Sequence, residues 1–272
     1  MKPAEILRDI KKLPKKLLGQ NFLVDESVVR DMISSADIQP EDTVVEVGPG
    51  LGALTDELAS QAKLVLAIEM DQELVNYLRL NKKKRNIKII HGDALRIDWT
   101  VSLDSPYRIV ANIPYSITSP LLREIFGLEK KPTKVILLVQ KEMAIRITAE
   151  PGSSERGFLT LLTEAAAKAK IIRTVKPGSF YPRPKTDSAI IELTPLPENR
   201  ADKIYWPAVE AGFRHKRQTL CNAINKDLKL TKSEIINVLD TSGLNPLIRA
   251  QNLSFAEWEI VSQRIEKLVK KG

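Results

Sequence analysis

Five short apolar runs, separated by segments with helical spacing, fill the first half of this 272-residue chain. Each run is four to six residues long and rich in β-branched side chains, and turn-forming residues lie close by, so each predicts a strand. Alternation of strands with helices constrains the chain to an α/β fold, in which a mostly parallel sheet is covered on both faces. The runs are Thr43–Val47, Leu64–Glu69, Ile87–Ile90, Tyr107–Ala111 and Val135–Gln140.

The pattern changes after about residue 140. Lys141–Ala149 and Phe158–Ala169 have helical spacing and are separated by a Pro-Gly-Ser-Ser breaker. Ile171–Val175 and Ser188–Leu193 are predicted to form a closing pair of strands around a proline-rich loop.

No strand pattern follows Pro195, and helix-initiating signals take over. Thr231–Glu234 and Ser254–Glu257 each have the Ser/Thr-x-x-Glu spacing of a capping box, which predicts that a helix begins there. We therefore expect an α/β domain over residues 1–195, with a basic N-terminal arm, and a small helical domain over residues 196–272.

The net charge of the chain indicates which class of partner it binds. Forty-two Lys and Arg residues against 34 Asp and Glu residues give a net charge of +8, which favours an anionic partner such as nucleic acid. Because Cys221 is the single cysteine and only His91 and His215 are histidines, we expect no disulfide, no zinc cluster and no metal site. No export signal or apolar span is visible in the sequence, so we expect a cytoplasmic protein. The basic clusters that could contact phosphates are Lys11–Lys16, Lys82–Arg85, Lys130–Lys134 and Arg214–Arg217.

A glycine-rich segment, Glu46–Gly52, lies between the first strand and the helix that follows it. Gly48 and Gly50 allow a sharp turn and the close approach of a ligand at the carboxyl end of the sheet. Glu69 ends the next strand, where a carboxylate is placed to accept both hydroxyls of a ribose. Because Gly48-x-Gly50-x-x-Ala53 also satisfies the relaxed dinucleotide fingerprint, a nicotinamide oxidoreductase stays open at this point. Asp93, after the third strand, could accept a hydrogen bond from an adenine amine or could simply cap a turn.

The motif Asn112-Ile113-Pro114-Tyr115 follows the fourth strand and is the strongest indication of chemistry. The exocyclic amine of adenine is a poor nucleophile because its lone pair is delocalised into the ring. The side-chain oxygen of Asn112 and a neighbouring main-chain carbonyl could accept both N–H bonds, which would free that lone pair for attack. Pro114 fixes the local backbone, and the Tyr115 ring offers a stacking face worth about 1–3 kcal/mol.

The chain resembles the small-subunit ribosomal RNA adenine N6,N6-dimethyltransferases, the family that includes the bacterial kasugamycin-sensitivity methylase. The resemblance covers almost the whole chain. The chain departs from the family's usual sequence at Arg156–Thr160 and at His215–Gln218. The blocks that carry it are Leu18–Asp25, Val45–Thr55, Asn112–Tyr115, Val139–Glu142, Pro151–Ser153, Phe180–Lys185, Asp187–Ala189, Phe213–Leu220 and Arg249–Ser254.

The resemblance implies a Rossmann-like class I methyltransferase fold with a C-terminal helical domain that helps to hold RNA, and S-adenosylmethionine as the methyl donor. By family analogy, Tyr115 and Phe180 stack on the target adenine, which must leave its own stack. Phe22 closes the same pocket. For both Phe22 and Phe180, the alternative is an ordinary core aromatic. Among the basic clusters, we prefer the one with Arg214, Lys216 and Arg217 as the RNA-contact site, because the apolar residues Phe213 and Leu220 can anchor it. The expected donor-site residues are Asn21, Leu23, Gly48, Gly50, Glu69, Asp93 and Asn112, and the expected catalytic residues are Asn112, Ile113, Pro114 and Tyr115.

The implied reaction is in-line transfer of methyl groups to N6 of two adjacent adenines in a terminal hairpin of small-subunit rRNA, during ribosome biogenesis. We expect a monomer that acts on a pre-ribosomal small subunit. Two related alternatives stay open: a large-subunit rRNA adenine methyltransferase of the macrolide-resistance type, and a non-catalytic nucleic-acid-binding relative.

Overall fold

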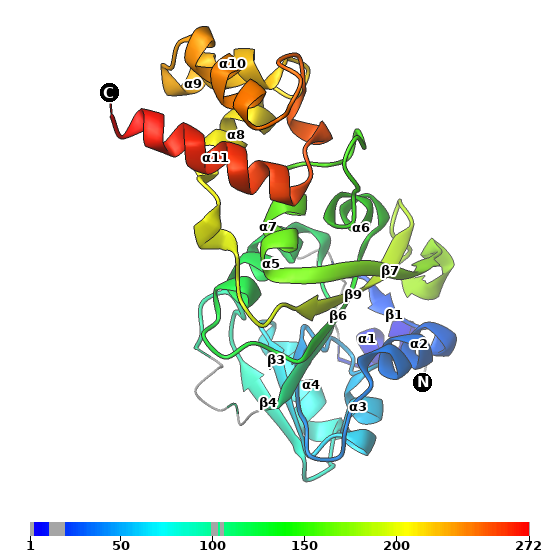
Figure 1. The fold of residues 1–272 in the computed structure, drawn as a ribbon. Coiled ribbons are helices and arrows are strands. Elements are labelled where there is room, and N and C mark those ends of the chain that lie inside the picture. Colours follow the sequence, from blue (N-terminus) through cyan, green and yellow to red (C-terminus); the bar gives the residue numbers. More distant parts are fainter. Residues whose placement is uncertain (1–2, 11–19, 99–102, 104–105, 272) are drawn as a thin grey trace. The chain divides into compact units, whose positions relative to one another are not determined.

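The computed structural model describes residues 3–10, 20–98, 103 and 106–271 (Figure 1). Its contacts divide the chain into two compact units. The first comprises Met1–Ala144 and Lys168–Pro195, and the second comprises Ile145–Ala167 and Leu196–Gly272.

The first unit is an α/β domain. A short antiparallel pair, formed by β1 and β8, accompanies its main sheet. Its helices are α1 (Pro3–Asp9), α2 (Glu26–Ala36), α3 (Thr55–Gln61), α4 (Gln72–Asn81) and α5 (Thr118–Gly127), and α6 (Lys141–Ile147) begins in it. Its strands are β1 (Phe22–Leu23), β2 (Thr43–Val47), β3 (Leu64–Glu69), β4 (Ile87–His91), β5 (Tyr107–Asn112), β6 (Lys134–Gln140), β7 (Ala167–Val175), β8 (Phe180–Tyr181) and β9 (Ser188–Pro195).

The main sheet has seven strands in the order β4-β3-β2-β5-β6-β9-β7. Neighbours from β4 to β6 are parallel, and β9 joins β6 antiparallel. Every residue of β2 is buried, so both faces of the sheet are covered there. Apolar residues of α2 and α3 form one core with alternate residues of the strands. The predicted α/β architecture is confirmed, and the bounds of β2 and β3 are those expected from the sequence.

The predicted helix Phe158–Ala169 is too long. The helix α7 (Phe158–Ala166) ends at Ala166, and β7 begins at the next residue. The sequence from Ala167 to Lys170 alternates Ala and Lys, and the lysines are exposed there. This period of two suits an edge strand with one covered face, although Ala and Lys are both good helix formers. The predicted pairing of the two late strands is confirmed, since β7 lies beside β9.

The second unit is helical, and α7 belongs to it. Leu161 and Ala165 of α7 are buried in one core with Trp258, so residues 145–167 are not part of the first unit, contrary to the predicted 1–195 domain. Membership of a core is set by tertiary packing, which sequence order does not show. The predicted capping boxes at Thr231 and Ser254 are both present. The other helices are α8 (Trp206–Arg214), α9 (Leu220–Leu228), α10 (Lys232–Thr241) and α11 (Phe255–Val269).

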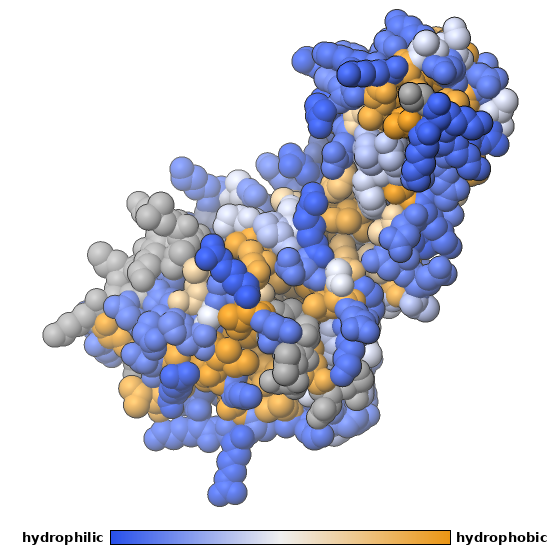
Figure 2. All heavy atoms as spheres, turned by 90° about the vertical axis from the view of Figure 1, so that its left-hand side faces the viewer, coloured by the Kyte–Doolittle hydropathy of each residue, from blue (hydrophilic) through white to orange (hydrophobic). Residues whose placement is uncertain are grey.

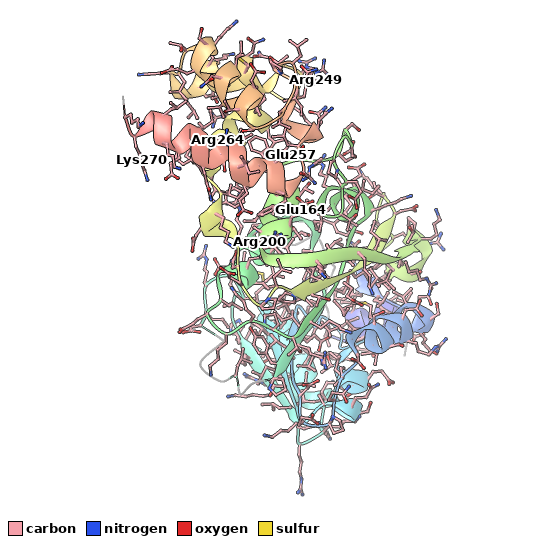
Figure 3. All side chains as sticks on the ribbon, in the orientation of Figure 1. Glu164, Arg200, Arg249, Glu257, Arg264 and Lys270 are labelled. Carbon is pink, nitrogen blue, oxygen red and sulfur yellow. The ribbon has the colours of Figure 1, made fainter. Side chains whose placement is uncertain are left out.

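A fully buried arginine fixes the start of α7. Arg156 makes a two-pronged ion pair with Glu164, with nitrogen–oxygen distances of 2.8 and 2.7 Å, and donates to the Ala149 and Leu253 carbonyls. Arg156, where the chain departs from the family's usual sequence, therefore anchors the start of α7. Figure 3 shows Glu164 together with Arg200, which donates to the Glu164 carbonyl at 2.8 Å and lies 4.1 Å from the Phe255 ring centre.

Hydrophilic side chains cover most of the face drawn in Figure 2, with apolar residues between them. In the part of the chain that the structure describes, every helix is too short or too polar to cross a bilayer.

Candidate active site

The glycine-rich loop follows β2 at the carboxyl edge of the sheet. Gly48, Gly50 and Gly52 have φ angles of 69°, 60° and 79°, a region that residues with a Cβ rarely adopt. The Gly48 amide donates to the Ile68 carbonyl at 2.9 Å, which ties the loop to β3. A Cβ at Gly48 would meet nothing nearer than the Asn112 carbonyl oxygen, at 3.8 Å. The absence of this Cβ therefore leaves open space between the loop and the end of β5.

Glu69 is the last residue of β3, and its carboxylate accepts hydrogen bonds from main-chain amides of the glycine loop and of the turn after β3. Its Oε2 accepts the Gly50 amide at 3.1 Å, and its Oε1 accepts the Asp71 amide at 2.9 Å. Burial raises the pKa of Glu69, although these main-chain hydrogen bonds oppose that shift. Each carboxylate oxygen has a second lone pair, so the side chain keeps capacity to accept hydroxyl groups of a ligand.

Asp93 follows β4 and caps a turn. Its Oδ1 accepts the Leu95 amide at 3.0 Å, and its Oδ2 lies 3.4 Å from Nε of the exposed Arg96. The turn-capping role is therefore present in the structure. Asp93 also lines the cavity described below, so both roles weighed from the sequence are compatible with its position.

The Asn112–Tyr115 motif begins on the last residue of β5. The Asn112 Nδ2 donates to the Asn21 carbonyl at 3.1 Å, an arrangement that leaves Oδ1 as the acceptor atom of the amide. Tyr115 begins a short 3₁₀ turn that ends at Ile117, and its hydroxyl lies 2.7 Å from Oγ of the buried Ser188. Burial raises the pKa of Tyr115, so the phenol stays neutral at physiological pH.

Phe22 and Phe180, two of the three aromatic residues expected at the base pocket, lie on the β1–β8 pair. Leu23 is opposite Phe180, and Phe22 is opposite Tyr181. Opposed residues of an antiparallel pair share a face. Leu23 and Phe180 pack into the main core, and Phe22 packs with Leu51 beside the glycine loop. Phe22 and Phe180 are therefore core aromatics that also border the cavity.

One cavity of about 260 Å³ brings these elements together, entirely within the first unit. All the residues predicted from the sequence to bind donor or base line it: Asn21, Phe22, Leu23, Gly48, Gly50, Glu69, Asp93, Asn112, Ile113, Pro114, Tyr115 and Phe180. Sequence reasoning missed Gln20, Glu46 and Ser116 as lining residues, and Ser188 as the partner of Tyr115.

Glu46 is a buried carboxyl group inside the sheet, at the rim of the cavity. Its Oε2 accepts the Thr55 hydroxyl at 2.7 Å, which joins β2 to the start of α3 across the glycine loop. Burial raises the pKa of Glu46 to about 8. An acidic residue within an otherwise apolar strand was the sequence signal for this group.

The predicted RNA-contact residues lie in the helical unit, outside the cavity. Arg214 forms an ion pair with Asp227 at 2.7 Å, and Lys216 donates to the Ser154 carbonyl. Arg217 is exposed and has no ion pair among the residues that the structure describes. The segment is anchored as expected, because Leu220 is buried and Phe213 packs on Trp258. RNA contact by these residues remains a prediction.

The other basic clusters are partly engaged within the protein. Lys82 pairs with Asp56 at 2.6 Å. Lys131 donates to the Phe126 carbonyl at 2.7 Å. The Lys11–Lys16 cluster lies outside the described residues, as do the first two residues of the Leu18–Asp25 block. Among the residues described, no three His, Cys, Asp or Glu side chains gather in an arrangement that could hold a metal ion.

The sheet order, the glycine loop and the cavity at the carboxyl edge of the strands define a class I methyltransferase with a helical C-terminal unit. Residues 12–267 match the family model described as ribosomal RNA adenine dimethylase. The chain belongs to this ribosomal RNA adenine dimethylase family.

Sequence relatives and solved structures agree with this assignment. The chain is 39% identical to a Clostridium botulinum ribosomal RNA small subunit methyltransferase A, over 97% of this chain and 98% of the relative. A protein of the same description from Dehalococcoides mccartyi is 38% identical, over 90% of this chain and 86% of the relative. The crystal structure of a dimethyladenosine transferase from Plasmodium falciparum superposes with a TM-score of 0.76 at 25% identity, covering 90% of this chain and 98% of that one. The 23S rRNA methyltransferase ErmE superposes with a TM-score of 0.72 at 25% identity, covering 90% and 100%.

Proposed function

We propose that this rRNA methyltransferase transfers methyl groups from S-adenosylmethionine to N6 of two adjacent adenines in a terminal hairpin of small-subunit rRNA. The observation that carries the proposal is the single cavity in which the glycine loop, Glu69, Asp93 and the Asn112–Tyr115 motif meet. We further propose that the protein acts as a cytoplasmic monomer on pre-ribosomal small subunits.

One group of the cavity residues suits the methyl donor. Gly48 leaves open space where a side chain would stand, and Glu69 offers lone pairs for two ribose hydroxyls. The Asp93 carboxylate is available to an adenine amine at the cavity wall. Asn21 and Leu23 also line the cavity. Bound S-adenosylmethionine supplies an electrophilic methyl group.

A second group of the cavity residues suits an extruded adenine. Asn112 is held through Nδ2, so its Oδ1 accepts one N–H of the adenine amine. A neighbouring main-chain carbonyl accepts the other N–H. Two accepted hydrogen bonds favour a pyramidal nitrogen whose lone pair points towards the methyl group. Tyr115 and Phe180 stack on the base, and Phe22 closes the cavity.

These interactions require no general base. The amine becomes strongly acidic once it is alkylated, so it loses its proton to water. Catalysis comes from orientation and from preorganised acceptors that strengthen as charge develops on nitrogen. Glu46 is buried and accepts the Thr55 hydroxyl, which suits a structural role.

Similarity to ErmE keeps a large-subunit substrate as the second candidate. The small-subunit substrate is favoured because the relatives at 38–39% identity carry that description, whereas ErmE is 25% identical.

The test is methylation of ribosomal particles that lack the modification. The enzyme is incubated with undermethylated small subunits and radiolabelled donor, and the rRNA is digested for nucleoside analysis. We expect labelled N6,N6-dimethyladenosine from small subunits and none from large subunits in a matched reaction. Label confined to large subunits, or label only in monomethyladenosine after prolonged incubation, would contradict the proposal.

A further inference from the structure

Tyr181 is an exposed aromatic residue that lies beside the cavity, and the proposed function gives it no role. It lies opposite Phe22 in the β1–β8 pair, so the two side chains are on the same face of this small sheet. Phe22 is buried and lines the cavity, whereas Tyr181 is 41% exposed and does not line it. The sheet therefore places an uncovered ring next to the wall of the base-binding cavity.

The residues that follow Tyr181 carry uncompensated positive charge. Arg183 and Lys185 are both exposed, and neither has an ion pair among the residues that the structure describes. Asp187, the next acid along the chain, is already paired with Lys176 at 2.8 Å and lies 3.9 Å from Lys141. The loop Tyr181–Lys185 itself contains no carboxylate.

The backbone of this loop is restricted. Pro182 and Pro184 alternate with the two cations, and each proline fixes its own φ angle. A restricted loop loses little conformational entropy when it binds a partner. The Tyr181 ring and the charges of Arg183 and Lys185 are therefore preorganised for contact with a binding partner.

We propose that Tyr181 stacks on a nucleotide that flanks the target adenine, while Arg183 and Lys185 contact phosphates of the same strand. The inference rests on the proposed function. Extrusion of the target base leaves its neighbours without a stacking partner, and an exposed aromatic ring offers a replacement. The two free cations match the phosphates of that strand, and they favour RNA over an apolar protein partner as the occupant.

The first test locates the contact. A benzophenone amino acid is incorporated at position 181 of the full-length enzyme, and the variant is irradiated with undermethylated small subunits in the presence of S-adenosylhomocysteine. We expect cross-links to rRNA within a few nucleotides of the methylated adenines. The same amino acid at position 80, which is exposed on α4, is the control and should give no such cross-link. Cross-links to a ribosomal protein only, or to distant rRNA, would overturn the inference.

The second test measures methylation kinetics. Tyr181→Ala should raise the KM for small subunits about tenfold, with kcat and S-adenosylhomocysteine affinity within about twofold of the unsubstituted enzyme. Tyr181→Phe should restore the KM because it keeps the ring, and Leu80→Ala should change nothing. Arg183→Ala and Lys185→Ala should each weaken the salt dependence of KM.

An unchanged KM for Tyr181→Ala, or an equal loss in Tyr181→Phe, would refute stacking by this ring. Failure of the proposed function has a different signature, because the unsubstituted enzyme would then produce no dimethyladenosine in small subunits. An active enzyme whose Tyr181→Ala variant behaves normally would refute the flanking-nucleotide contact alone.

Discussion

The buried carboxyl group of Glu46 predicts a measurable pH dependence of stability. Burial raises its pKa from 4.5 to about 8, so the folded protein holds a proton on Glu46 across a range in which the unfolded chain releases it. A group that binds protons more tightly in the folded state makes the free energy of unfolding fall as pH rises. The fall should occur between pH 4.5 and about 8 and should level off above that range.

The size of this effect follows from the shift. One pKa unit corresponds to about 1.4 kcal/mol, so a shift from 4.5 to about 8 corresponds to about 5 kcal/mol lost by alkaline pH. Glu46→Gln removes the titration and keeps an oxygen that accepts the Thr55 hydroxyl. The variant should match the unsubstituted protein near pH 4.5 and be more stable above pH 8, by up to about 5 kcal/mol.

The assay is urea unfolding followed by far-ultraviolet circular dichroism at a series of pH values from 5 to 9. Glu57→Gln, an exposed substitution on α3, is the control for simple loss of a negative charge. A raised pKa of Glu46 is refuted if the stability difference between Glu46→Gln and the unsubstituted protein is the same at every pH, or if the variant is the less stable protein at pH 8.

Three further predictions follow from the site and from the helical unit. Glu69→Ala removes the carboxylate that orders the glycine loop and is assigned to the ribose hydroxyls, so S-adenosylhomocysteine should bind about tenfold to a hundredfold more weakly by calorimetry. Unchanged affinity would exclude this role of Glu69. Tyr115→Ala should raise the KM for small subunits about tenfold, and a KM like that of the unsubstituted enzyme would exclude stacking by this ring. Arg156→Met leaves Glu164 without its buried partner and should lower the free energy of unfolding in urea by about 3–5 kcal/mol. Arg156→Lys should not restore stability, because an ammonium group cannot make the two-pronged pair. A loss below about 1 kcal/mol for Arg156→Met would contradict this structural role.

The local features of the α/β unit could be read from the sequence because they depend on neighbouring residues. β2 and β3 have apolar, β-branched sequences with turn signals close by, and both strands were bounded correctly. Sequence pattern also placed Asn112 at the end of a strand, where the carboxyl edge of the sheet collects ligand-binding side chains.

The features that sequence reasoning missed depend on contacts between distant segments. Tyr115 meets Ser188 across 73 positions of the chain, and no periodicity or spacing rule predicts that hydrogen bond. Likewise, α7 joins the helical core through Leu161, although it precedes two strands of the sheet in the sequence. The end of α7 was missed because Ala and Lys favour helices locally, and the sheet edge overrode that preference.

The proposed mechanism depends on Asn112, which orients the amine of an extruded adenine for methyl transfer. Single-turnover methylation of undermethylated small subunits, at saturating donor concentration, tests it most directly with Asn112→Ala and with Asn81→Ala as an exposed control. We expect Asn112→Ala to slow the transfer about 100-fold to 1000-fold while it binds small subunits as tightly as the unsubstituted enzyme, and Asn81→Ala to react normally. A transfer rate for Asn112→Ala within about threefold of the unsubstituted enzyme would contradict this role of Asn112.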